Sequence, residues 1–336
     1  MIEKRTKVAL IACSNGMGHV RRMLALAESL NELGANPVLL APKEKCERLI
    51  ALNKSFKPKI INFQSTTKNK DWLSGKADNW TQDLPDLSGY DSIVSDNLLE
   101  ILRIRKDAWI SGSFIWQYAL SGITTDKIKN AEKILSKYYP RMISSSLFSA
   151  DYLYKKTRLF NVGLFSFYSS HENEDSSDIL IASGTGGCIE DEVEILVDKI
   201  SRLSRPILGT IWIEPALWKS NMPMWMLPAN FTPLMYQKLR CAVVRPGVGT
   251  VTDCLISGAR VFSLYESGNY EMKDNALKIE KAGVGEDCSD ILLAWKAALN
   301  YYNNSIAQAK HNKALGLLDR NGANDAAALI LSNKDG

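Results

Sequence analysis

The chain contains the same order of features twice: a short apolar run, a glycine turn and a helical pattern. The first copy consists of Val8–Cys13, a turn over residues 14–18 and a helix that begins near Val20. The second copy consists of Asp178–Ser183 and a glycine-rich turn over residues 184–187, again followed by a helical pattern. Apolar runs of this length between turns are typical of strands buried on both faces of a sheet. The repetition therefore predicts two α/β units of similar plan.

The segments between and after these copies keep the alternation of strands and helices. On the first helix an apolar stripe runs from Val20 to Leu30, and Gly34 ends the pattern as a C-terminal glycine does. Strands that alternate with helices form a parallel sheet, so the fold class is α/β. The further strands that we expect are Val38–Ala41, Ile60–Phe63, Ser92–Ser95, Ala108–Gly112, Met142–Ser145, Ile207–Ile213, Cys241–Arg245 and Arg260–Leu264.

The length of 336 residues is sufficient for two domains. The polar segment Ser169–Ser177 lies between the two copies and has the composition of a linker. We therefore expect an N-terminal Rossmann-like domain over residues 1–168 and a C-terminal one over residues 176–320. A helix at Ala323–Leu331, within residues 321–336, is expected to pack back on the first domain. Ligands of open α/β sheets bind beyond the carboxyl ends of the strands, so the two parallel sheets are expected to face an interdomain cleft.

Charge and cysteine content narrow the possible functions. The net charge is +4 and the basic residues form no long block, so we expect no nucleic-acid partner. The six cysteines occur singly and without CxxC spacing, which indicates reduced thiols in a cytosolic protein and not a zinc site or a disulfide framework.

The sequence also bears on membrane contact. Val8–Cys13 is too short for the core of a signal peptide, and no stretch has the roughly 18 apolar residues of a membrane span. We therefore expect a cytoplasmic protein, with peripheral association at the inner face of the membrane left open. The residues that we consider for such a peripheral patch are Trp72, Trp80, Lys68, Lys70 and Lys76.

The first glycine turn does not fit a dinucleotide-binding fingerprint. Gly16 and Gly18 match its first two glycines, but Arg21 stands where the third is needed. The acidic residue that would bind the ribose after the second strand is also missing, since Ala41-Pro42 occupies that place. A dehydrogenase is therefore not expected.

The run Gly16-x-Gly18-His19-x-x-Arg22-x-x-Ala25-Leu26-Ala27 resembles the opening of GT-B-fold nucleotide-sugar glycosyltransferases, in particular MurG-like enzymes of families 28 and 1. It is also similar to the nucleotide-sugar hydrolase of the pseudaminic acid pathway. The resemblance implies a GT-B fold, with Gly16 and Gly18 close to the ligand and His19 as the base for an incoming hydroxyl or water. Imidazole suits general-base catalysis near neutral pH. The structural alternative is a histidine that caps the helix or fills a gap.

The segment from Val244 to Gly285 resembles the donor half of the same families. Glycines ahead of a helix present backbone N–H groups to an anion, which suits a diphosphate at this turn. By resemblance, Arg245, Gly247, Gly249 and Thr250 contact the diphosphate, Asp253 the ribose and Glu271 the donor sugar, and Asn275 is a further residue of the donor site. The alternative for Asp253 is an acid that only complements the helix dipole.

This donor half departs from the family pattern at two positions. The ribose-binding acid is usually Glu, whereas this chain has the shorter Asp253. The position after Glu271 usually carries Gln, whereas Met272 cannot make a second polar contact with the sugar. The identity of the donor sugar therefore stays open.

Three weaker signals complete the expected site. Gly184, Thr185 and Gly186 lie where the fold again approaches the donor phosphates, although glycine turns at strand ends are common. By resemblance, the stretch containing Phe231 and Thr232 holds the nucleotide base. On the acceptor side Asp96 and Trp116 follow strands, with a helix cap and a core position as their structural alternatives.

Together these features predict an inverting glycosyltransferase that moves a sugar from a nucleotide-diphosphate donor, most simply a UDP-sugar, to an acceptor hydroxyl. The acceptor is a glycan, a lipid-linked molecule or a protein, and the resemblance implies surface-glycan or cell-envelope synthesis. The chain has no Asp-x-Asp motif, so we expect neither a metal nor another cofactor. A nucleotide-sugar hydrolase, an epimerase of the same fold and a non-catalytic nucleotide-sugar-binding protein are the alternatives.

Overall fold

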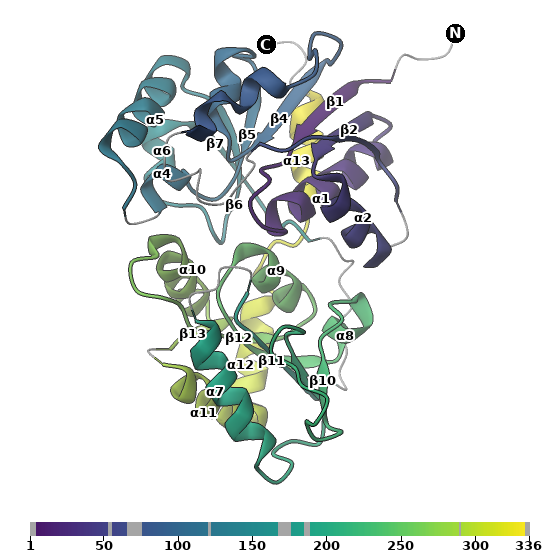
Figure 1. The fold of residues 1–336 in the computed structure, drawn as a ribbon, viewed down its shortest axis with the longest axis vertical. Coiled ribbons are helices and arrows are strands. Elements are labelled where there is room, and N and C mark those ends of the chain that lie inside the picture. The colour runs from purple at the N-terminus through teal and green to yellow at the C-terminus, as the bar shows by residue number, and fades with distance from the viewer. Residues whose placement is uncertain are drawn as a thin grey trace. The chain divides into compact units, whose positions relative to one another are not determined.

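The computed structural model describes residues 5–52, 56–65, 76–119, 122–166, 176–184, 189–288 and 290–332. The chain divides into two compact units (Figure 1). Unit 1 comprises Met1–Phe167 together with Asp319–Gly336, and unit 2 comprises Tyr168–Leu318. Each unit contains one parallel sheet with helices, so the α/β class expected from the sequence is confirmed.

The sheet of unit 1 has seven parallel strands in the order β3-β2-β1-β4-β5-β6-β7. The chain winds outward in one direction from β1 to β3 and then in the other direction from β4 to β7. The point where the direction reverses, between β1 and β4, is where ligands of doubly wound sheets bind. The strands are β1 (Lys7–Ile11), β2 (Asn36–Ala41), β3 (Lys59–Asn62), β4 (Ser92–Asp96), β5 (Trp109–Ser111), β6 (Arg141–Ser145) and β7 (Arg158–Val162).

Helices connect these strands and bury their apolar stripes. The stripe predicted from Val20 to Leu30 is buried in the first helix, and Gly34 follows that helix with a φ of 83°. The helical segments of unit 1 are α1 (Gly18–Glu32), α2 (Lys43–Leu52), η1 (Lys76–Asp83), η2 (Leu99–Arg103), α4 (Trp116–Ala119), α5 (Thr125–Tyr138), α6 (Leu153–Lys156) and α13 (Gly322–Ser332).

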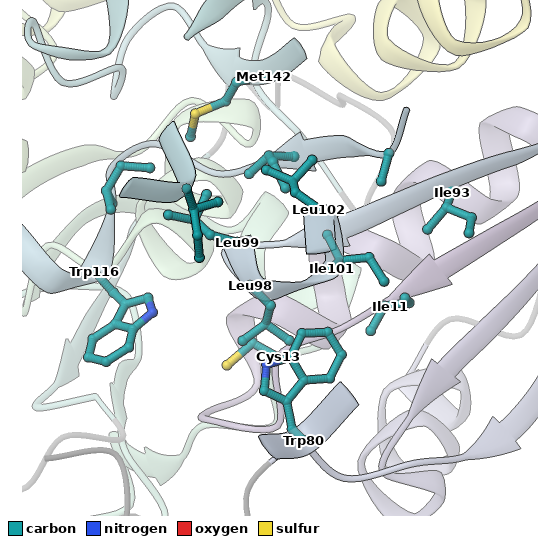
Figure 2. Close-up of a cluster of buried hydrophobic side chains, with 14 of the residues drawn as sticks. Ile11, Cys13, Trp80, Ile93, Leu98, Leu99, Ile101, Leu102, Trp116 and Met142 are labelled. Atoms are coloured by element: carbon teal, nitrogen blue, oxygen red, sulfur yellow. The ribbon is translucent and has the colours of Figure 1, made fainter. Parts of the chain in front are cut away.

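One face of this sheet carries a large apolar core, part of which Figure 2 shows. Ile11 and Ile93 from the strands pack there with Leu99 of η2 and with Trp116 of α4. Trp116 is thus a core residue, as the structural alternative predicted. Chemistry is therefore expected at the polar ends of the strands and not within this core.

Trp80 does not lie in an exposed patch, as the expected peripheral contact with a membrane would require. Its side chain is 5% exposed and lies in the same core (Figure 2). Its ring N–H donates to the Glu100 carboxylate at 3.2 Å. Its assignment to a surface patch is therefore wrong, because the side chain is buried and its ring packs edge to face with that of Phe63, 5.9 Å apart between centroids. Lys68, Lys70 and Trp72 lie outside the described residues. In the described part of the chain, no helix combines the length and apolar character needed to cross a membrane.

The C-terminal helix α13 belongs to unit 1, where it packs against α1 and β7 (Figure 1). Two backbone hydrogen bonds fix its start, from Leu164 N–H to Asp319 O at 2.8 Å and from Gly322 N–H to Leu164 O at 3.1 Å. A Cβ on Gly322 would lie 2.2 Å from the carbonyl oxygen of Gly163, so only glycine permits this close approach of the two backbones.

The sheet of unit 2 repeats the plan with six parallel strands in the order β10-β9-β8-β11-β12-β13. Its direction of winding reverses between β8 and β11. The strand expected at Ile207–Ile213 is shorter, because the N–H of Thr210 donates to the Asp178 carboxylate at 2.8 Å and regular pairing begins at Ile211. The strands are β8 (Asp178–Ala182), β9 (Ile211–Ile213), β10 (Met226–Pro228), β11 (Leu239–Val244), β12 (Arg260–Ser263) and β13 (Gly285–Asp287).

The helices of unit 2 cover both faces of its sheet. One face packs against α7 and α11 in a second apolar core, and α9 and α10 contact the strands as well. The five cysteines in the described residues are all buried. The helices are α7 (Glu190–Ser201), α8 (Pro233–Gln237), α9 (Val248–Ile256), α10 (Tyr270–Lys281), α11 (Ile291–Tyr302) and α12 (Ser305–Leu315).

Candidate functional site

His19 and Asp96 meet at the point in unit 1 where the winding of the sheet reverses. His19 is the second residue of α1, which follows β1, and Asp96 is the last residue of β4. The two strands are neighbours in the sheet, so the residues after their carboxyl ends come together. The Nδ1 atom of His19 lies 2.6 Å from Oδ2 of Asp96. The Asp96 side chain is fully buried, whereas that of His19 is 21% exposed.

This contact determines which ring nitrogen of His19 is available for chemistry. A buried carboxylate can only accept a hydrogen bond, so we assign the proton of the neutral ring to Nδ1. The lone pair of the neutral imidazole is then on Nε2. A partly exposed imidazole with a free lone pair and an oriented ring can act as a general base.

Arg22 lies one turn further along α1 and binds the other oxygen of the same carboxylate. Its Nε and Nη2 atoms donate to Oδ1 of Asp96 at 2.9 and 2.6 Å. Nη2 also lies 3.5 Å from Nδ1 of His19. One oxygen of Asp96 therefore contacts a guanidinium, and the other contacts an imidazole.

The turn between β1 and α1 is tied to its neighbours. Lys45 of α2 donates to the carbonyl oxygen of Ser14 at 2.7 Å, and the N–H of Ser65 donates to the Ser14 hydroxyl at 2.7 Å. Gly16 has a φ of 79°, which a residue with a side chain rarely adopts. Gly18 opens α1, and a Cβ placed on it would have no described atom within 4 Å. The backbone is thus held in place while the space beside Gly18 stays open.

In unit 2 the N-terminus of α9 stands at the reversal point between β8 and β11. The helix ladder begins with the Val251 N–H donating to the Gly247 carbonyl at 3.1 Å. The N–H groups of Val248, Gly249 and Thr250 precede this ladder, as in the first turn of any helix. A Cβ on Gly247 would also have no described atom within 4 Å. These N–H groups and the Thr250 hydroxyl can receive an anion.

Arg245 and Glu266 form an ion pair beside this turn. Arg245 donates Nε to one oxygen of the Glu266 carboxylate at 2.9 Å and Nη2 to the other at 2.5 Å. Asn269 donates to the same carboxylate at 2.6 Å. Burial alone would raise the pKa of Glu266, but the hydrogen bonds from Arg245, the backbone and Asn269 lower this pKa to about 2. The predicted site residue Arg245 is therefore oriented by a partner that is ionised at neutral pH.

Asn275 and Met272 face the interior of unit 2. The Asn275 amide donates to the carbonyl oxygen of Pro246 at 3.0 Å, and its side chain is 2% exposed. It thereby fixes the turn ahead of α9, and a direct contact with the nucleotide-sugar stays a prediction. Met272 is buried, whereas Glu271, in the first turn of α10, is half-buried.

The remaining predicted donor residues are distributed around the same sheet. Asp253 lies in the second turn of α9 with its side chain 2% exposed. The Thr232 hydroxyl accepts from the Met235 N–H at 3.3 Å and so caps α8, while Phe231 has a φ of 52° and packs 6.4 Å from the ring of Tyr236. Their contacts with a nucleotide stay predictions.

The turn after β8 has an acidic partner that sequence analysis did not identify. The N–H groups of Ser183 and Gly184 donate to the Glu214 carboxylate at 2.7 and 3.1 Å, and the Ser183 hydroxyl donates to it at 2.8 Å. The N–H of Gly184 thus already has an acceptor. Thr185 and Gly186 lie outside the described residues. The structure also contains, among the residues that it describes, no group of three or more His, Cys, Asp or Glu side chains that could hold a metal.

Comparisons with known proteins identify the fold. No family model and no curated protein matches the sequence. Among solved structures, the glycotransferase of kitacinnamycin is 11% identical and matches 98% of this chain and 99% of its own, with a TM-score of 0.66. SsfS6, a glycosyltransferase of Streptomyces sp. SF2575 complexed with thymidine diphosphate, is 12% identical, with 98% and 100% covered and a TM-score of 0.63. UGT89C1 of Arabidopsis thaliana, complexed with UDP, is 11% identical, with 98% and 100% covered and a TM-score of 0.67. The chain therefore has the GT-B fold expected from the sequence.

Proposed function

We propose that the protein is a glycosyltransferase that moves a sugar from a nucleoside-diphosphate donor to an acceptor hydroxyl. The observation that carries this proposal is the His19–Asp96 contact of 2.6 Å at the reversal point of the first sheet. The contact orients an imidazole as a base at a position where α/β sheets bind ligands. The GT-B fold supports the proposal, because it is the fold of solved glycosyltransferases.

In the proposed reaction His19 Nε2 removes the proton of the acceptor hydroxyl. The oxygen attacks the anomeric carbon and forms the new glycosidic bond, while the bond from that carbon to the diphosphate oxygen breaks. The electron pair of the broken bond leaves with the nucleoside diphosphate. A single displacement of this kind inverts the anomeric configuration. Asp96 stabilises the imidazolium that forms, in the manner of the acid in other His–Asp pairs.

The departing diphosphate is proposed to bind at the N-terminus of α9. The first-turn N–H groups, the Thr250 hydroxyl and the positive end of the helix dipole stabilise its negative charge. Arg245 lies beside the turn, where its ion pair with Glu266 fixes its orientation. In this proposal the charge of the leaving group is met by the chain's own groups, and no metal takes part.

The donor nucleotide is best sought first among uridine and thymidine diphosphates. UGT89C1 was solved with UDP and SsfS6 with thymidine diphosphate, and both share the GT-B fold with this chain. The acceptor is proposed only as a molecule with a nucleophilic hydroxyl. UGT89C1 was also solved with quercetin, a molecule of this kind.

A nucleotide screen tests the donor half of the proposal. UDP, TDP, GDP and CMP are added singly to the full-length protein, and its melting temperature is measured. A ligand present at 100 times its dissociation constant adds about 2.7 kcal/mol to the free energy of unfolding, which is a readily measured shift. We expect stabilisation by UDP or TDP, and release of the diphosphate when the matching nucleotide-sugar is supplied with hydroxyl-bearing acceptors.

The outcomes of this screen separate transfer from its alternatives. A new glycoside formed with the released diphosphate supports a transferase, whereas free sugar in equal amount to the diphosphate, unaffected by acceptors, shows a hydrolase. Stabilisation without turnover of any nucleotide-sugar shows a binding protein. If no nucleotide stabilises the chain, the proposed donor site is wrong.

A further inference from the structure

We propose that Arg22 is a positioning residue that holds the Asp96 carboxylate and sets the charge balance around His19. The inference rests on the proposed function only for its effect on rate, because the charge balance can be measured without any substrate. Arg22 is not expected to touch the reacting groups. It acts through Asp96, which in turn contacts the imidazole.

The hydrogen bonds divide the two oxygens of Asp96 between two partners. Oδ1 accepts from both Nε and Nη2 of Arg22, and Oδ2 contacts Nδ1 of His19. Two donors on one oxygen fix the rotation of the carboxylate, so Oδ2 stays directed at the imidazole. Because His19 and Arg22 are three residues apart on α1, they lie on the same side of the helix and reach the same carboxylate.

Burial makes this pairing necessary. The Asp96 side chain is fully buried, and that of Arg22 is 11% exposed. An isolated carboxylate is costly to remove from water, and a guanidinium with matching hydrogen bonds offsets that cost. Asp96 therefore depends on Arg22 more than on His19, whose ring carries no charge in its neutral form.

The charge balance determines how strongly Asp96 attracts a proton to His19. A neutral imidazole beside a lone carboxylate forms a group of net charge −1, and protonation brings this charge to zero. With Arg22 present the group is neutral before protonation and carries +1 afterwards. The positive charge of Arg22 thus opposes the further positive charge that protonation of the imidazole would add.

The other ionisable groups on neighbouring elements do not replace Arg22 in this role. Lys45 of α2 directs its ammonium at the carbonyl oxygens of Ser14 and Gly16. Cys13, just after β1, is neutral because burial raises the pKa of its thiol to about 12. On α13, which packs against α1, Asp325 is the one charged side chain among the described residues, and it interacts with Asp319 and Gly163.

The test measures the protonation of His19 directly by NMR. Imidazole C–H signals of the full-length protein are followed against pH, and the His19 signal is assigned by its loss in His19→Gln. In Arg22→Met we expect the pH of half-protonation to rise by about one unit, as for an imidazole beside an uncompensated carboxylate. In Arg22→Lys, which keeps the charge, it should stay within a few tenths of a unit of the wild-type value.

Two further variants guard against a general effect of substitution. Arg48→Met makes the same change at an exposed arginine of α2 and should leave the His19 titration unchanged. Asp96→Asn combined with Arg22→Met removes both charges, so the pH of half-protonation should fall back from the Arg22→Met value towards that of the wild type. If Arg22→Met alone does not fold, a double variant that does fold would show that the buried carboxylate depends on Arg22, whereas failure of both variants to fold would contradict the proposed role.

The inference is overturned if Arg22→Met titrates like the wild type, or if the double variant keeps the shift of the single one. An activity measurement then separates this result from a failure of the proposed function. Turnover is measured against pH in Arg22→Met and in the wild type. If turnover depends on His19 but falls at the same acidic pH in both proteins, only the proposed role of Arg22 is wrong. If turnover does not depend on His19, the proposed function is wrong, and the titration result still stands.

Discussion

At the scale of single residues, the burial of Asp96 and its contacts with Arg22 and His19 determine its proposed role. Its carboxylate is fully buried, accepts from Arg22 and contacts His19 at 2.6 Å. The same residue type at Asp91 accepts the N–H of Lys7 in an exposed position. The two carboxylates differ in burial and in the group that each one contacts. We therefore expect the substitution of Asp by Asn to have different effects at the two positions.

Asp96→Asn is expected to reduce turnover of a nucleotide-sugar by about 10²–10⁴-fold, the usual contribution of general-base catalysis. An amide can still accept from Nδ1 of His19, but it cannot stabilise the imidazolium by charge. Steady-state rates at saturating donor measure the effect, and Asp91→Asn is the matched control. Equal rates in the two variants would show that Asp96 serves only the fold.

Gly247→Ala tests whether a diphosphate approaches the backbone ahead of α9. The φ of −69° is accessible to alanine, and a Cβ there meets no described atom within 4 Å, so the melting temperature should not fall. Binding of UDP or TDP should weaken at least tenfold, because the added methyl group occupies space beside the N–H groups. Calorimetric titration measures the binding, with Gly89→Ala as a control at another open glycine. Unchanged affinity would remove the diphosphate from this turn.

The sequence predicted part of the candidate site. The resemblance of the run from Gly16 to Ala27 to GT-B enzymes implied that His19 is the catalytic base, and this role stays a prediction. Its pairing with Asp96 was not predicted, since the two residues are 77 positions apart and meet only through the adjacency of β1 and β4. The partners Glu214 and Glu266 were missed for the same reason: each is an acid after a strand whose neighbour the sequence does not specify.

At the scale of secondary-structure elements, the predicted strands are those with continuous apolar runs. The three strands that were not predicted, β7, β10 and β13, lie at edges of the two sheets. An edge strand has one neighbour and needs less apolar surface, and proline is tolerated there. Accordingly, Gly285–Asp287 has no apolar residue, and Met226–Pro228 ends in proline.

Helix α12 introduces a pH-sensitive residue into the packing of unit 2. His311 is fully buried, with Nε2 3.0 Å from the Gly258 carbonyl oxygen and its ring 5.7 Å from that of Tyr301. Burial, with a smaller contribution from the charge of Arg260, lowers the pKa of His311 from 6.5 to about 4. The folded state therefore binds a proton less readily than the unfolded state.

The sign of the resulting pH dependence follows from proton uptake. Below pH 6.5 the unfolded chain protonates this residue while the folded chain does not, so the free energy of unfolding falls as the pH drops towards 4. The loss from this residue is roughly 3 kcal/mol across that window. His311→Gln can keep the hydrogen bond to Gly258 without titrating. Urea unfolding at several pH values should therefore show a shallower decline in the variant, and equal slopes would contradict this prediction.

At the scale of the whole molecule, the chain ends in the unit where it began. Helix α13 follows unit 2 in sequence but packs on α1 and β7 of unit 1 (Figure 1). The side chain of Ile330 in this helix is fully buried. The last helix therefore contributes to the stability of the unit that contains His19. The sequence predicts a helix at Ala323–Leu331 that packs back on the first domain, and the contacts of α13 identify α1 and β7 as the elements that it packs on.

Ile330→Ala should lower the free energy of unfolding by about 2–5 kcal/mol, as expected for truncation of a buried side chain. Hydrogen exchange followed by mass spectrometry should show faster exchange in α1 and β7, with α9 unchanged. Leu317→Ala, at a residue that is 83% exposed, is the control and should change stability by less than about 0.5 kcal/mol. Equal loss of protection in both units would contradict the assignment of α13 to unit 1.

The two units are proposed to serve one reaction, in which unit 2 binds the donor and His19 of unit 1 activates the acceptor. The most direct measurement is the release of nucleoside diphosphate and the formation of glycoside by wild type and His19→Ala, under identical donor and acceptor concentrations. We predict that both products form in equal amounts in the wild type. In His19→Ala both rates should fall together by about 10²–10⁴-fold, while the affinity for the nucleotide is unchanged. Full activity in His19→Ala would contradict the proposed mechanism.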